Sequence, residues 1–173
     1  MSEITPLYIH RAEWWMLVTM LAYFLMNGAQ LFETFVLVPK WTADAPRSLG
    51  VLQGPFAPDL KTFWIIAHSI HELTFIAAIF FCWRIPEVRN LLLLLFALHF
   101  AVRLWTLGFF APQIMGFQKA DLQEVSDSIR SAVAKWHQLN YVRVAIFLLV
   151  SAGIVFVYSK VRDLHPHIAS AIK

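Results

Sequence analysis

Residues 64–83, WIIAHSIHELTFIAAIFFCW, place three ionisable side chains in an apolar run long enough to cross a bilayer. They are His68, His71 and Glu72. Ionisable groups inside hydrocarbon are costly and usually mark a functional site. Imidazole nitrogens and carboxylate oxygens are ligands that iron, copper, manganese and zinc accept. The order His-x-x-His-Glu is neither the His-Glu-x-x-His of zinc proteases nor the Glu-x-x-His of di-iron bundles, so the pattern predicts neither of these two classes of metal enzyme.

Polar and ionisable side chains also occur in the other long apolar stretches: Asn27, Gln30, Glu33, His99, Arg103, His137, Asn140 and Arg143. Neighbouring membrane helices alternate in direction, and each residue adds about 1.5 Å of rise, so the depths of these groups can be compared. All of them fall in the half of the bilayer nearest the two long loops, or at its middle. This segregation predicts one polar chamber inside a helix bundle, where cofactors and metals are commonly held.

Helical spacing suggests a role for each imidazole. His68 and Glu72 are i, i+4 neighbours and share a helix face, so we predict that they bind a metal ion together with His99. His71 is adjacent to Glu72 and points about 100° away from it. We therefore expect His71 to donate a supporting hydrogen bond or to face a neighbouring helix. His137, in the segment WHQLNYVR, is a further candidate contact to a cofactor, although an interfacial histidine is ordinarily solvated.

The remaining polar groups have predicted catalytic roles. Glu33 is expected to be an extra ligand or a general base. Arg103 and Arg143 would balance the carboxylates or hold an anionic oxygen, and Asn140 would orient a substrate by hydrogen bonding. The two arginines and the two carboxylates sum to zero charge, so pairing that serves structure alone stays an alternative.

Two further alternatives remain open for the chamber. A b-type haem would take His68 or His71 on one side and His99 on the other, with the arginines at its propionates. A proton or ion pathway could also use Glu, His and Arg, but the polar groups stop at mid-membrane. The cofactor alternatives are therefore a transition metal, haem or none.

Four stretches must position these residues. The chain is 59% hydrophobic and 14% charged, against about 25% charged for a soluble domain, which indicates a membrane protein. Stretches of spanning length run roughly over 15–38, 63–83, 91–111 and 137–158. With no water to bond the backbone, and no period-two alternation, they are predicted as helices. The fold class is therefore all-α, a four-helix transmembrane bundle forming a single domain over residues 1–173.

Flanking residues refine this prediction. Pro39 and Pro112 are expected to close the first and third helices. Tryptophans near the helix ends are expected to anchor at the membrane interface: Trp14, Trp15, Trp41, Trp64, Trp83 and Trp136. In the loop between the third and fourth helices, ADLQEVSDSIRSAVAKW repeats Leu122, Val125, Ile129 and Val133 at helical spacing. It predicts a short amphipathic helix, lying on the bilayer or acting as a lid.

Charge patterns bear on location and partners. The tight turn at 84–90 carries Arg84 and Arg89, and the C-terminal segment carries Lys160, Arg162 and Lys173, so the positive-inside rule favours both termini in the cytoplasm. No signal peptide or lipidation motif is expected. The formal charge of +3 is spread along the chain, which disfavours nucleic acid as a partner. Lipid is the expected partner, and an oligomer stays open.

Two motifs carry a resemblance. NGAQLFETFVLVP, with Phe32, Phe35 and Pro39, and WHQLNYVR, with Trp136, His137, Asn140 and Arg143, resemble the first and last helices of the anthrone-oxygenase-like family of small four-helix membrane proteins. The chain departs from that family after the third helix, where APQIMGFQ keeps Pro112 without the usual asparagines, and in the HSIHE cluster.

The resemblance implies oxidation of a lipid-soluble aromatic substrate by dioxygen. Combined with the chamber, it leads to a prediction of an integral-membrane oxidoreductase of oxygenase type that depends on a metal. The alternative from another class is a non-catalytic haem-binding or ion-handling membrane protein.

Overall fold

Four long antiparallel helices form the molecule in the computed structural model, which describes residues 4–124 and 126–164. They are α1 (Pro6–Phe32), α3 (Leu60–Phe81), α4 (Pro86–Trp105) and α6 (Asp127–Arg162). The described residues contain no strand, and four helical segments are long and apolar enough to cross a membrane. The predicted all-α, four-helix architecture is confirmed. Val125 and Lys173, used in the sequence argument, lie outside the described residues.

The first and third helices are longer than expected because neither proline ends its helix. α1 passes through a π-helical turn (Glu33–Leu37) into α2 (Val38–Thr42), and α4 passes through a second one (Thr106–Phe110) into α5 (Ala111–Phe117). Proline lacks an N–H and clashes with the carbonyl four residues earlier. A wider π turn just before each proline relieves both conflicts, so the prediction that Pro39 and Pro112 close the helices was wrong.

The predicted separate amphipathic helix was also wrong. Residues 127–136 are the first turns of α6, which continues without a break to Arg162. Val133 and Trp136 are buried and belong to the same inward face as Asn140 and Phe147 further along the helix. Because the apolar stripe continues in phase into the span, it packs against the bundle and does not lie flat on the bilayer.

Two apolar clusters hold the bundle together, one at each end. The larger cluster fills the half near the α3–α4 turn, with Phe75 and Phe147 among its buried members. The smaller one, at the long-loop end, contains Trp41, Phe110 and Trp136. The rings of Trp41 and Trp136 lie 4.8 Å apart and both are buried, so these two tryptophans are core residues and not the interfacial anchors expected.

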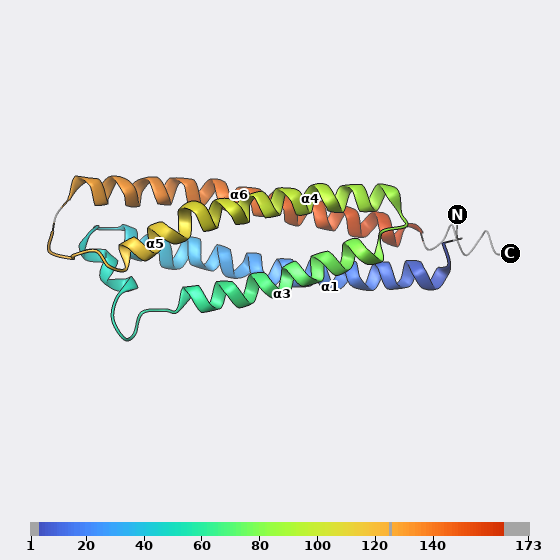
Figure 1. The fold of residues 1–173 in the computed structure, drawn as a ribbon, viewed down its shortest axis with the longest axis horizontal. Coiled ribbons are helices and arrows are strands. Elements are labelled where there is room, and N and C mark those ends of the chain that lie inside the picture. The colour runs from blue at the N-terminus through green and yellow to red at the C-terminus, as the bar shows by residue number, and fades with distance from the viewer. Residues whose placement is uncertain (1–3, 125, 165–173) are drawn as a thin grey trace.

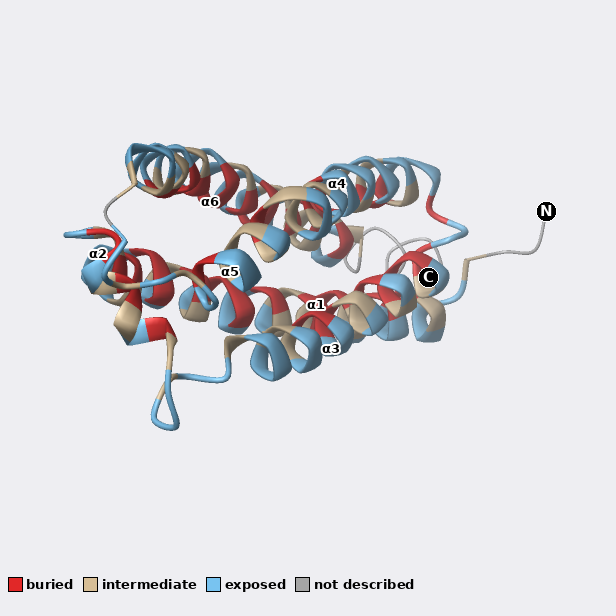
Figure 2. Ribbon diagram, turned by 60° about the vertical axis from the view of Figure 1, so that its left-hand side comes forward, coloured by how far each residue is buried: buried red, intermediate tan, exposed pale blue. Residues whose placement is uncertain are grey.

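The outer surface of the bundle is apolar, as a lipid-facing surface requires. Figure 2 shows buried residues turned toward the middle of the bundle and exposed residues turned outward. Large side chains such as Leu25, Leu73 and Leu149 are among the exposed ones. A protein that folds in water would not leave so many large apolar side chains exposed. The chain is therefore a multi-pass membrane protein in contact with lipid.

The helix ends bear on topology. α1 begins and α6 ends at the end of the bundle that also holds the α3–α4 turn (Figure 1). The start of α1 and the end of α6 therefore lie on the same side of the bundle. Their cytoplasmic location rests on the charge argument alone and stays a prediction.

Helix starts carry their own caps. Thr5 accepts a hydrogen bond from the Tyr8 N–H, and Asp59 accepts one from the Thr62 N–H at 3.0 Å. Such caps satisfy backbone donors that the first turn leaves free. The hydrogen bonds from Thr62 lower the pKa of the exposed Asp59 carboxyl below its usual value.

Candidate metal centre

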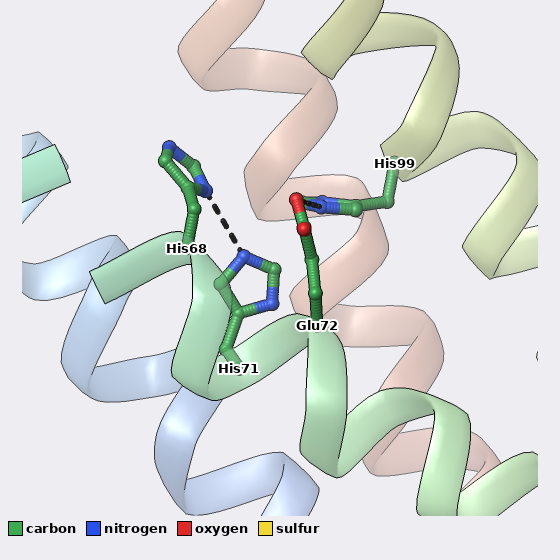
Figure 3. A group of neighbouring side chains, drawn as sticks. All are labelled: His68, His71, Glu72 and His99. Carbon is green, nitrogen blue, oxygen red and sulfur yellow. Dashed lines mark hydrogen bonds and ion pairs between the residues drawn. The ribbon is translucent and has the colours of Figure 1, made fainter. Parts of the chain in front are cut away.

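Helices α3 and α4 bring three imidazoles and one carboxylate together midway along the bundle. His68, His71, Glu72 and His99 each offer one ligand atom, and these atoms all lie within 4.8 Å of one another. We call this group the His/Glu cluster. Figure 3 shows His68, His71 and Glu72 on one helix, facing His99 from the other. The three imidazoles are buried and Glu72 is half-buried. The structure therefore places together the three predicted metal ligands and His71.

Contacts within the cluster are short. His68 Nδ1 and His71 Nε2 share a hydrogen bond of 3.0 Å, and Glu72 Oε1 lies 3.7 Å from His99 Nε2. The rings of His71 and His99 pack edge to face with centroids 4.6 Å apart. His71 thus faces His99 on the neighbouring helix α4 and also shares a hydrogen bond with His68, so both arrangements that the helical spacing allowed for His71 are present.

Each end of the cluster is held by a residue outside it. Tyr23, on α1, is fully buried, and its hydroxyl lies 3.2 Å from His99 Nδ1. Arg103 Nε donates a 2.8 Å hydrogen bond to Glu72 Oε1. Partners of this kind fix the orientation of ligand side chains and tune their basicity. Tyr23 was not found from the sequence, because a single tyrosine in an apolar helix has no distinguishing pattern.

The spacing of the cluster fits a metal ion after a small contraction. Bonds from a transition metal to imidazole nitrogen or carboxylate oxygen measure about 2.0–2.2 Å, so two opposite ligands lie at most about 4.4 Å apart. The largest separation in the cluster is 4.8 Å, which small side-chain rotations can close. Within the described part of the chain, His71 Nδ1 and His99 Nε2 are buried without a hydrogen-bond partner. Free buried nitrogens are what an unsatisfied ligand set presents.

A cavity of about 420 Å³ adjoins the cluster on its long-loop side. Its wall includes His68 from the cluster, together with Glu33, Arg103 and Arg143. Aromatic side chains form much of the rest: Trp64, Phe110, Trp136 and Phe147. A cavity of this size that is mostly apolar, with a few converging polar groups, is typical of a small-molecule site.

Arg143 is held rigidly at the cavity wall. Its guanidinium Nη2 donates a 2.6 Å hydrogen bond to Asn140 Oδ1, and its charge lies over the ring of Phe110, 4.4 Å from the centroid. Asn140 in turn donates to Thr34 Oγ1 at 3.0 Å. Both polar ends of the Asn140 amide are therefore occupied within the protein. Asn140 is not among the residues that line the cavity, so it positions Arg143 and does not touch a ligand there.

Glu33 and Arg143 both face the cavity without forming a direct ion pair. The ion pairs within 4.0 Å among the described residues join Glu72 to Arg103, Glu72 to His99 and Glu87 to Lys160. Glu33 Oε2 and Arg143 Nε are buried and lack hydrogen-bond partners in the described chain. The charge balance suggested two pairings of a carboxylate with an arginine. Glu72 and Arg103 form a direct ion pair, whereas Glu33 and Arg143 do not approach within 4.0 Å.

His137 lies apart from the cluster. Its Nε2 is 3.1 Å from the Tyr141 hydroxyl, and it lines a separate hollow of about 260 Å³ with Asp44 and Arg130. The structure thus gathers eight of the nine predicted site residues around the cluster and its cavity, and leaves His137 outside.

The two π-helical turns contribute to the cavity wall. Glu33 begins the first, and Thr106, Leu107 and Phe110 belong to the second. Such turns are frequent at functional sites because they rotate side chains out of the regular helical register. The prolines that follow them were visible in the sequence, but they indicated helix ends rather than π turns.

Comparison with protein-family models, curated proteins and solved structures finds no match to this chain. The resemblance to the anthrone-oxygenase-like family stays a hypothesis that rests on the two short motifs.

Proposed function

We propose that this chain is an integral-membrane oxidoreductase of the oxygenase type, in which the His/Glu cluster binds one transition-metal ion and the adjoining cavity binds a lipophilic substrate. The observation that carries the proposal is the convergence of three imidazoles and one carboxylate within 4.8 Å inside an apolar bundle. Iron, copper, manganese and zinc all accept this ligand set, and two histidines with one carboxylate are the ligands of many non-haem iron oxygenases.

His68, Glu72 and His99 would hold the ion, with His71 as a fourth ligand or as hydrogen-bond partner of His68. A bound redox metal would supply activation of dioxygen. The chain's own residues would orient the metal ligands and exclude water. Arg103 restrains Glu72, Tyr23 restrains His99, and the aromatic walls of the cavity keep water away from the reacting atoms.

The alternatives have less support. A haem between opposed histidines needs a flat slot as wide as a porphyrin, whereas His71 and His99 pack edge to face at 4.6 Å. An ion pathway needs polar groups in both halves of the membrane, whereas the half near the α3–α4 turn is filled by the buried side chains Phe75, Ala78 and Val150.

The test uses the full chain in lipid nanodiscs, loaded with ferrous iron without oxygen. Nitric oxide binds where dioxygen would, and its adduct with ferrous iron gives an electron paramagnetic resonance signal. We expect that signal in the wild type and in His137→Ala, and its loss in His99→Ala. Retention of the signal in His99→Ala would contradict the proposal, as would a wild type that binds iron yet gives no adduct.

A further inference from the structure

The cavity beside the His/Glu cluster has a polar inner wall and an apolar outer wall. Glu33 and Arg143 are each only 6% exposed. Ile65 and Leu107, which line the same cavity from α3 and the second π-helical turn, are 56% and 59% exposed and belong to the lipid-facing surface. A molecule reaching the inner wall from the bilayer would therefore have its polar end deepest and its apolar part toward lipid.

The inner wall presents one unused acceptor and one unused donor. In the described chain, Glu33 Oε2 and Arg143 Nε have no hydrogen-bond partner, although other bonds hold both side chains in place. Arg143 is fixed by Asn140, and Glu33 receives a hydrogen bond from Trp64. A buried polar group without a partner is costly, so each favours a ligand that satisfies it.

Charge balance restricts the kind of ligand. The charge of Arg103 is matched by Glu72 at 2.8 Å, and Lys61, which also lines the cavity, is an exposed residue. The buried charged groups on the inner wall are therefore Glu33 and Arg143, one negative and one positive. An anionic ligand would meet repulsion from Glu33, and a cationic one would meet repulsion from Arg143. Neither could satisfy both groups. A neutral hydroxyl can, because its oxygen accepts from Arg143 while its proton is donated to Glu33.

We propose that the cavity binds a neutral, membrane-soluble molecule through a hydroxyl group held between Arg143 and Glu33, beside His68. This inference deepens the proposed function by giving the chemical class of the substrate, and it rests on that proposal only in taking the cavity as the substrate site. The hydroxyl end lies at the inner wall, and the apolar part lies along the aromatic walls toward Ile65 and Leu107.

The cavity size guides the choice of probe. Its volume of about 420 Å³ has room for about fourteen non-hydrogen atoms, taking about 30 Å³ for each, the share of one water in the liquid. Decanol suits this volume. Methyl nonyl ether, undecane, nonanoate and decylamine match it in number of non-hydrogen atoms. The ether can accept a hydrogen bond but cannot donate one, and undecane can do neither. Nonanoate carries a negative charge and decylamine a positive one.

The experiment measures retention of tritiated decanol by nanodiscs that contain the chain, with empty nanodiscs subtracted to remove partition into lipid. Each unlabelled probe then competes for the bound decanol. Decanol should compete about tenfold to a hundredfold better than the ether, because it alone makes the hydrogen bond to a charged carboxylate. Undecane, nonanoate and decylamine should be weaker than decanol by at least the same factor.

Variants assign that preference to its residues. In Glu33→Gln the acceptor loses its charge, and the ratio of alcohol to ether affinity should fall toward one. Glu87→Gln, the same substitution at the far end of the bundle, should keep the wild-type ratio. The ratio is an internal control, since a partly unfolded variant loses both probes together. If Glu33→Gln retains neither probe, Arg143→Gln provides the second test and should weaken alcohol and ether alike while undecane is unaffected.

The inference would be overturned if wild-type protein bound decanol and the ether with nearly equal affinity. That result would mean that water, and not a ligand hydroxyl, lies between Glu33 and Arg143. A ratio unchanged by Glu33→Gln, or a charged probe that outcompetes decanol, would overturn it too. Metal content measured on the same samples separates the two proposals. Selective decanol binding without metal would contradict the metal-dependent function alone, and stoichiometric metal with no alcohol preference would contradict this inference alone.

Discussion

The ion pair between Glu72 and Arg103 should contribute measurably to the stability of the bundle. Arg103 Nε lies 2.8 Å from Glu72 Oε1, and the side chains are 16% and 30% exposed. A hydrogen bond to a charged group contributes about 1.5–3 kcal/mol, whereas removing one partner of a fully buried pair costs about 3–5 kcal/mol. Because these side chains keep some exposure, we expect a coupling energy of about 1.5–2.5 kcal/mol, above the ~0–1 kcal/mol of surface pairs.

The assay is a double-mutant cycle with Glu72→Gln and Arg103→Met, separately and together. Unfolding free energies are measured by titration with denaturing detergent in mixed micelles, with a chelator present so that metal binding does not contribute. Each single variant leaves its partner's charge without a counter-ion inside the bundle. The double variant should therefore recover much of the loss, and its effect should fall short of the sum of the two.

A matched control exists in the same chain. Glu87 and Lys160 lie 3.6 Å apart with side chains 83% and 37% exposed, and pairs of this kind contribute about 0–1 kcal/mol. The cycle through Glu87→Gln and Lys160→Met should give less than about 0.5 kcal/mol of coupling. Equal couplings in the two cycles, or purely additive effects of Glu72→Gln and Arg103→Met, would refute the reasoning.

Three further predictions follow from single contacts. Tyr23→Phe removes the hydroxyl that lies 3.2 Å from His99 Nδ1 and should weaken metal binding about 10- to 100-fold without abolishing it, as measured by competition with a chelator; an unchanged affinity would show that this contact does not orient the ligand. A Cβ at Gly153 would approach a leucine side chain of α4 to 2.5 Å, whereas a Cβ at Gly116 meets nothing within 4 Å. Both substitutions gain the same helix propensity, so Gly153→Ala should be less stable than Gly116→Ala by about 1–3 kcal/mol; equal effects in detergent unfolding would contradict this. Hydrogen bonds at the start of α3 hold the pKa of Asp59 below its usual value, so its ionised form stabilises the fold above the unfolded-state pKa. That contribution disappears as pH falls through the folded-state pKa. The difference in unfolding free energy between wild type and Asp59→Asn should therefore shrink on acidification, and a difference that grows would contradict this prediction.

The sequence predicted the helices and the gathering of the chamber residues well, for a physical reason. Lipid requires long apolar helices, and the few polar groups that such helices tolerate must face inward. The i, i+4 spacing of His68 and Glu72 then placed both on one face, and the depth comparison placed them and His99 in the same half of the bilayer or at its middle. These arguments need only the rise and period of a helix.

Other features depended on contacts between helices, which one sequence does not contain. The hydrogen bond of Tyr23 to His99 joins α1 to α4, and the link from Arg143 through Asn140 to Thr34 joins α6 to the first π-helical turn. Asn140 was therefore expected at a substrate, whereas its amide is used to hold Arg143. Prolines in membrane helices were interpreted by the rule for soluble helices, although lipid favours keeping the helix and absorbing the proline in a π turn.

The central claim is that the His/Glu cluster binds a metal ion, and metal content tests it most directly. Full-length protein in nanodiscs, incubated with ferrous, cupric, manganous or zinc ions and freed of excess, would be assayed by elemental analysis. X-ray absorption would then identify the ligands of any metal retained. We predict one metal ion per chain with imidazole among its ligands at about 2.0–2.2 Å. It should be lost in folded His99→Ala protein and retained in His137→Ala. A wild type that retains none of the four metals, or a His99→Ala variant that retains its metal with unchanged imidazole ligation, would contradict the account.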